Sequence, residues 1–174
     1  YTYEPGDTRL HDRSTAAHNT IEIDGLNQSE IWSSFRCGRR VTPLPWAWRD
    51  YEGGPMFKGG YKGIWPKVSQ ERKFNFRDNT IQVEDTLLSE DEHNGILNLH
   101  LHPSIAVHLE DKGGKARLKT GRKDIAHLFI DCGNWKIKKT PYHPTFGKEI
   151  ERNCLSYFFP FEKNHTLKWM IRFP

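Results

Sequence analysis

The sequence predicts an all-β protein, an antiparallel β-sandwich of two or more packed sheets with little or no helix. Three observations predict it: apolar and polar residues alternate with a period of two, turn residues separate the alternating runs, and helical periodicity is almost absent. The length of 174 residues suits a single domain over residues 1–174. The hydrophobic fraction is a modest 36%, but aromatic residues at 13% offer large areas to bury.

The first strand is expected over residues 20–24, where Ile21 and Ile23 alternate with polar neighbours. The same alternation predicts further strands over residues 73–77, 81–84, 97–102, 135–138, 155–161 and 167–173. Turn-forming residues are expected to separate strands at residues 77–79, 92–95, 112–115 and 131–134.

Residues 41–66 combine prolines, glycine pairs and aromatic residues, and we expect them to form a long excursion over the sheet. Within it, Trp46 and Trp48 either stack on sugar rings or cap the open end of the core. The second interpretation is favoured because tryptophan is usually largely buried.

The charge balance is mildly basic, with 26 Lys and Arg against 22 Asp and Glu and a formal net charge of +4. This fits an anionic partner such as an acidic polysaccharide, and also an ordinary solvated surface. We expect no membrane span, because no stretch is long and apolar enough, and no nucleic-acid partner, because no known nucleic-acid module is visible. The spacing of Cys37, Cys132 and Cys154 argues against a zinc ribbon or disulfide framework, although one bridge plus a free thiol is compatible.

The segment most informative about function is Arg-Ser-Thr-Ala-Ala-His-Asn-Thr at residues 13–20, which runs directly into the first predicted strand. The strand period, carried back two residues, places His18 on the polar side. A histidine held there on a rigid element is a candidate acid/base group. The alternative is a histidine that only hydrogen-bonds its own loop.

This segment, together with several others, resembles the heparinase II/III-like polysaccharide lyases. The resemblance rests on Tyr-Glu-Pro-Gly-Asp at 3–7, residues 13–20, Asp-Gly at 24–25, Gln-Ser-Glu-Ile-Trp at 28–32, Gly-Tyr at 60–61, Leu-His-Leu-His-Pro at 99–103 and Pro-Tyr-His-Pro-Thr-Phe-Gly at 141–147. It implies that the chain is the C-terminal β-sandwich of a larger lyase, whose N-terminal α-helical toroid it lacks.

The resemblance implies a function and a location. The family's histidine of the His-Asn-Thr pattern assists β-elimination of polysaccharides that contain uronic acid, in a cleft shared with the toroid. We therefore expect His18 to be catalytic, the isolated chain to be inactive, and the protein to be secreted or periplasmic in a bacterium. Substrates are expected among heparin- or heparan-like glycans, alginate-like uronans and exopolysaccharides. The alternative is a non-catalytic carbohydrate-binding or structural sandwich.

Arg13, Asn19, Arg36 and Tyr61 are candidate substrate contacts. Arg13 can pair with a carboxylate or sulfate, or with a neighbouring acidic residue. Asn19 is also expected to hold the loop through side-chain to backbone hydrogen bonds. Arg36 belongs to a strand expected over residues 31–40, where its alternative role is plain surface. Tyr61 either offers its phenol near the cleft or anchors a turn from a buried position.

His100 and His102 share one face of a predicted strand, and this spacing can place two imidazoles on one metal. The resemblance implies that some family members bind a divalent cation, zinc or calcium, in this domain. No third ligand is evident from spacing, so two surface histidines on a polar strand face is the favoured interpretation. The sequence makes no cofactor certain.

Overall fold

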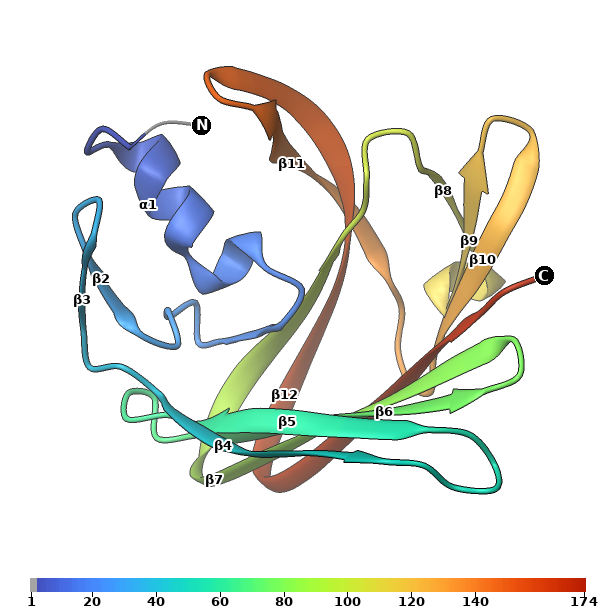
Figure 1. Ribbon diagram of the computed structural model, residues 1–174, viewed down its shortest axis with the longest axis horizontal. Coiled ribbons are helices and arrows are strands. Elements are labelled where there is room, and N and C mark those ends of the chain that lie inside the picture. Colours follow the sequence, from blue (N-terminus) through green and yellow to red (C-terminus); the bar gives the residue numbers. More distant parts are fainter. Residues whose placement is uncertain (1–2) are drawn as a thin grey trace.

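Apolar residues alternate along the strands, so each strand has one apolar face. These strands join in one large antiparallel sheet, which curves so that the apolar faces pack together (Figure 1). The computed structural model describes residues 3–174. The strands are β1 (Ile21–Ile23), β2 (Glu30–Trp32), β3 (Arg36–Gly38), β4 (Thr42–Arg49), β5 (Met56–Lys62), β6 (Ser69–Arg77), β7 (Thr80–His100), β8 (Ala106–Glu110), β9 (Lys115–Thr120), β10 (Lys123–Ile130), β11 (Lys136–Thr145) and β12 (Lys148–Arg172). The predicted all-β antiparallel fold is confirmed, with 63% strand and 8% helix.

The large sheet has the order β4-β5-β6-β7-β12-β10-β9-β8, with β1 added to β7 and β11 added to β12. The strands β2 and β3 form a separate two-stranded sheet. Figure 1 shows the sheet curving, so that β4–β6 and β8–β10 lie on different sides of the molecule. One core cluster unites residues from β1, β7, β9, β10 and β12, and its largest fully buried side chain is Trp135.

Two long strands, β7 and β12, replace several of the short strands that the sequence predicts. They pair with each other along almost their whole length, with one register shift between Glu162 and Asn164. The turn expected at residues 92–95 is wrong, because these residues continue β7. Gly95 lies opposite Phe159, and a Cβ at this glycine would come within 2.5 Å of the Phe159 ring. The close packing of the Phe159 ring, rather than a turn, therefore explains why a glycine occupies position 95.

A short helical segment precedes β1: α1 (Asp7–Arg13) and the 3₁₀ turn η1 (Thr15–Ala17). A second 3₁₀ turn, η2 (Asp111–Gly113), joins β8 to β9. No residue of α1 is buried, which explains why the sequence shows no helical stripe there. Within the described residues, no helix is long and apolar enough to span a membrane.

The expected excursion over residues 41–66 is wrong as well, because most of it forms the paired strands β4 and β5 at one edge of the sheet. Trp46 and Trp48 are 72% and 52% exposed, so they do not cap the core. Trp48 instead ends a row of cross-strand neighbours that continues through Phe57 and Phe74 to the buried Val83. This row extends beyond the core because β4 is the edge strand, where burial is incomplete.

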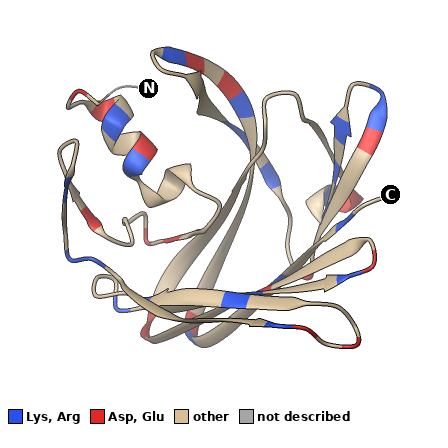
Figure 2. Cartoon of the chain, in the orientation of Figure 1, with Lys and Arg blue, Asp and Glu red and all other residues tan. Residues whose placement is uncertain are grey.

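The three cysteines are all free thiols: Cys37 and Cys132 are exposed and Cys154 is buried. The bridge left open by the sequence is therefore not formed. Basic and acidic segments alternate over the ribbon and do not gather on one element (Figure 2).

Candidate functional site

His18 lies between η1 and β1 and is exposed, as its place on the polar side of the strand predicts. Its ring Nδ1 lies 2.7 Å from the carbonyl oxygen of Ser14. Because a carbonyl only accepts hydrogen bonds, Nδ1 carries the proton in the neutral ring and Nε2 keeps its lone pair. The side chain borders an open groove of about 230 Å³, which Arg13, Thr20 and Gln28 also line. The neutral ring can thus accept a proton at Nε2.

The backbone on both sides of His18 is fixed by β7. On one side, the carbonyl of Ala16 accepts a hydrogen bond from His100 Nε2 at 2.9 Å. On the other, Asn19 Oδ1 accepts one from the backbone N–H of His100 at 2.7 Å, which is the loop-holding role predicted for Asn19. The carbonyl of Thr20 accepts a third from the N–H of Asn98 at 3.0 Å. The histidine therefore lies in a short segment, residues 16–20, that is held to β7 at both ends; we call this segment the arch.

His100 is the last residue of β7 and is only 9% exposed, so the expectation of two surface histidines is wrong for it. Both ring nitrogens are occupied, since Nε2 donates to Ala16 and Nδ1 lies 3.2 Å from the Thr140 hydroxyl. Burial is the main cause that lowers the pKa of His100 to about 4; the hydrogen bond to Ala16 opposes this shift, and the nearby charges of Arg152 and Lys138 add to it.

His102 lies beyond the end of β7, is exposed, and contacts the Ser104 hydroxyl at 2.8 Å. It does not share an environment with the buried ring of His100. Among residues 3–174, no group of three or more His, Cys, Asp or Glu side chains is arranged to hold a metal ion. In the part of the chain that the structure describes, the ring nitrogens of His100 contact Ala16 and Thr140, so the residues present do not fit a metal shared by His100 and His102.

Arg13 donates from Nη1 to the carbonyls of Ser33 at 2.6 Å and Arg36 at 3.2 Å. It holds α1 against the β2–β3 hairpin, rather than clamping an acidic residue. The single strand expected over residues 31–40 is wrong, because a turn with Ser33 at φ +55° divides it into β2 and β3. The Arg36 side chain is exposed on this hairpin, which also lines the groove beside His18 through Ile31 and Cys37.

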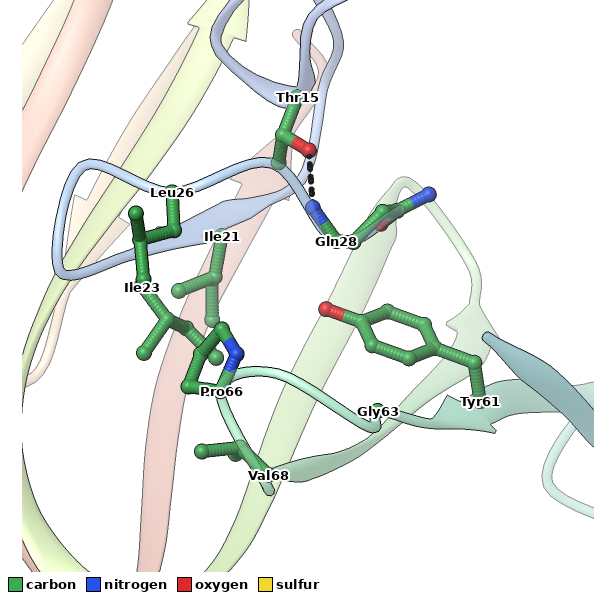
Figure 3. Close-up of a pocket in the computed structure, with 9 residues that line it drawn as sticks. All are labelled: Thr15, Ile21, Ile23, Leu26, Gln28, Tyr61, Gly63, Pro66 and Val68. Carbon is green, nitrogen blue, oxygen red and sulfur yellow. Dashed lines mark hydrogen bonds between the residues drawn. The ribbon is translucent and has the colours of Figure 1, made fainter. Parts of the chain in front are cut away.

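Tyr61, the last residue but one of β5, points into the interior beneath the segment that carries Thr15 and Gln28 (Figure 3). The enclosed space that it lines is about 10 Å³, which is barely room for one water molecule. Its hydroxyl donates to Gln70 Oε1 at 3.0 Å, and burial raises the pKa of Tyr61 to about 12. Tyr61 is thus a half-buried residue that anchors to Gln70 below the arch.

Sequence reasoning missed the most heavily hydrogen-bonded group near the site, the carboxylate of Asp85. This residue is fully buried and accepts hydrogen bonds from Arg72, Gln70 and Trp169. A signal was present, because Asp85 occupies an inward position of β7 between the apolar Val83 and Leu87. A charge on the apolar face of a strand requires buried partners.

A comparison with models of protein families matches residues 1–169 to the family described as heparinase II/III-like, C-terminal. The chain belongs to this family. No curated protein matches the chain.

Solved structures share the fold of this heparinase II/III-like domain at low sequence identity. A crystal structure of a mutant of heparan sulfate lyase HepC from Pedobacter heparinus has a TM-score of 0.72 and 14% identity, covering 99% of this chain and 27% of that one. The crystal structure of HepC without the mutation has a TM-score of 0.71 and 14% identity, covering 99% of this chain and 26% of that one. A crystal structure of heparinase III has a TM-score of 0.68 and 13% identity, covering 95% of this chain and 25% of that one. The chain therefore spans about a quarter of the length of these proteins.

Proposed function

We propose that this heparinase II/III-like domain is the β-sandwich part of a polysaccharide lyase and that His18 takes part in the β-elimination. The observation that carries the proposal is the hydrogen bond of His18 Nδ1 to Ser14, which leaves Nε2 unprotonated in the neutral ring of a residue that lines an open groove. The likeness to heparan sulfate lyase and heparinase III structures supports the reaction class.

The chemistry explains the need for such a group. β-Elimination removes the proton from C5 of a uronic acid, builds enolate-like charge on the adjacent carboxylate, and breaks the C4–O4 bond of the same residue. The glycosidic oxygen departs with the neighbouring sugar and needs a proton. An imidazole with a free Nε2 accepts the C5 proton when neutral, or donates to O4 when protonated. A cationic or amide group must neutralise the carboxylate, and Arg36, exposed on the hairpin that borders the groove, is our candidate within this chain.

The domain supplies only part of the proposed centre. The resemblance assigns a further acid/base tyrosine and a carboxylate-neutralising asparagine or histidine to an α-helical toroid, which we propose as the partner of the groove at His18. We expect the 174-residue chain alone to be inactive for this reason. The proposed substrates are acidic polysaccharides that contain uronic acid, and the proposed location is outside the bacterial cytoplasm.

The test is the product formed by the full-length protein encoded by the parent gene. Incubated with heparan-like, alginate-like and bacterial exopolysaccharides, it should release sugars with a new ultraviolet absorbance from the 4,5-unsaturated uronate. Elimination takes up no water, so products formed in ¹⁸O-water should carry no label from the cleavage step. Labelled, saturated products would indicate hydrolysis and contradict the proposal.

A second candidate is a non-catalytic carbohydrate-binding module, favoured by the exposed rings of Trp46 and Trp48 at the sheet edge. Aromatic faces of this kind offer large rigid contact areas to sugars. A full-length protein that binds these polysaccharides without cleaving them, and loses binding on Trp46→Ala, would favour this second function.

A further inference from the structure

We propose that the buried Arg72–Asp85 pair is a positioning device that fixes the arch carrying His18 and, through Gln70, the phenol of Tyr61. The catalytic meaning of this inference rests on the proposed function of His18. The positioning itself is a separate claim that can be measured without any enzyme assay.

Arg72 connects the core of the sheet to the arch. Its Nε and Nη2 donate to the two carboxylate oxygens of Asp85 at 2.7 and 3.1 Å, and its Nη1 donates to the carbonyl of Asn19 at 2.7 Å. Asn19 directly follows His18. A guanidinium has a rigid planar fork, so fixing two of its nitrogens on Asp85 also fixes where the third can hold the Asn19 carbonyl.

Asp85 is itself held in place. It is 0% exposed, and the indole Nε1 of Trp169 donates to its Oδ2 at 2.9 Å. Trp169 also packs its ring under the guanidinium of Arg72, 5.6 Å from the ring centroid. The pair is therefore anchored in packed sheet, whereas the His18 ring hydrogen-bonds to the Ser14 carbonyl of its own loop.

A second branch leads from Asp85 to Tyr61. Gln70 donates from Nε2 to Asp85 Oδ1 at 3.2 Å and accepts at Oε1 from the Tyr61 hydroxyl at 3.0 Å. Because a carboxylate only accepts, it orients the amide of Gln70, which in turn makes Tyr61 the donor. Thr20 Oγ1 lies 3.5 Å from the same Oε1, so this branch also reaches the arch from below.

Stability alone does not explain the arrangement. A buried ion pair contributes little net stability compared with apolar residues of similar size, although removing one partner is costly. Arg72 keeps one nitrogen, Nη1, free of Asp85, and this nitrogen hydrogen-bonds to the residue next to His18. The geometry of the pair therefore serves to position the arch rather than to add folding free energy.

The experiment uses Arg72→Lys in the full-length gene product, with Lys73→Met as the matched control. Lys keeps the charge, but its single nitrogen cannot reproduce the fork to Asp85 and Asn19. Lys73 is the next residue on β6 and pairs at 3.0 Å with Glu84, the strand neighbour of Asp85, in a half-exposed salt bridge. It therefore controls for the loss of a cross-strand ion pair at the same level of the sheet.

Two readouts separate positioning from general destabilisation. Amide hydrogen exchange should rise about tenfold or more at His18 and Thr20, while the amide of the core residue Leu97 is unchanged. If His18 is catalytic, kcat should also fall about tenfold or more with KM nearly unchanged, because a small misplacement of a reacting group lowers kcat strongly. Lys73→Met should change neither readout.

A second variant, Arg72→Met with Asp85→Leu, guards against misfolding because it leaves no unpaired buried charge. It should melt above Asp85→Leu alone and still show the fast exchange at His18 and Thr20. Unchanged exchange in both Arg72 variants, or an equal rise at Leu97, would overturn the inference. A wild-type protein without lyase activity whose Arg72 variants still loosen the arch would refute the proposed function and leave the positioning role standing.

Discussion

Two histidines around one short arch have opposite environments, and this difference determines what each can do. His18 is exposed and keeps Nε2 unprotonated in its neutral ring, whereas His100 is buried and uses both nitrogens to contact Ala16 and Thr140. In the neutral ring Nε2 donates to Ala16 and Nδ1 accepts from the Thr140 hydroxyl, and burial disfavours the charged form of the ring. Protonation of His100 should therefore weaken the support of the arch that carries His18.

This leads to a pH prediction for stability. The pKa of His100 is about 4 in the folded protein, below the ordinary histidine value near 6.5 that applies when the chain is unfolded. Between these values the unfolded chain binds a proton that the folded chain does not, so the free energy of unfolding should fall as pH falls through this window. His100→Gln keeps an N–H donor for Ala16 and cannot titrate, so its denaturant midpoint should fall less between pH 6.5 and 4 than that of the wild type.

The control is His102→Gln, which replaces an exposed histidine two residues further on. It should leave the wild-type pH dependence in place. A His100→Gln protein that loses as much stability as the wild type over this window would show that His100 titrates normally in the fold.

At the residue scale, the sequence was a better guide to exposed groups such as His18 than to the buried groups that support them. The His-Asn-Thr pattern located His18, and the hydrogen-bonding tendency of asparagine predicted that Asn19 holds the loop. The charge of Asp85 in an apolar row was visible, but its partners Arg72 and Gln70 come from another strand. Only the cross-strand register brings them together, and alternation within one strand does not contain that information.

At the scale of elements, β7 and β12 form the spine of the sheet, and their pairing depends on close contact between a glycine and an aromatic ring. Gly95 faces Phe159, whose ring occupies the volume that a Cβ at Gly95 would need. The same glycine and its polar neighbours caused the incorrect prediction of a turn at residues 92–95. A glycine in an alternating run can mark either a close approach or a bend, and the sequence alone does not distinguish them.

We therefore expect Gly95→Ala to lower the free energy of unfolding by about 1–3 kcal/mol, because the added methyl group overpacks against Phe159. Gly59→Ala is the matched control on β5, since its Cβ would meet the Phe57 ring at an ordinary 3.6 Å. Urea denaturation of both variants checks this. Equal stability of the two variants would contradict the packing argument for Gly95.

At the scale of the whole molecule, the sequence predicted the fold class and the exposed position of His18, because both follow from which side chains alternate along a strand. It did not predict the sheet order, the two long strands or the edge position of β4. Those depend on contacts between residues far apart in the chain, such as the pairing of β12 with β7 and β10. The exposed Trp46 at that edge shows how strand position overrides the usual burial of tryptophan.

Our proposal is that the sheet presents His18 to an acidic polysaccharide held between this domain and a helical partner. The most direct test is kcat of the full-length gene product carrying His18→Ala, with His102→Ala as the matched exposed-histidine control. We expect His18→Ala to lower kcat about a hundredfold or more with an unchanged melting temperature, and His102→Ala to retain wild-type turnover. Wild-type turnover in the His18→Ala protein would contradict the central claim.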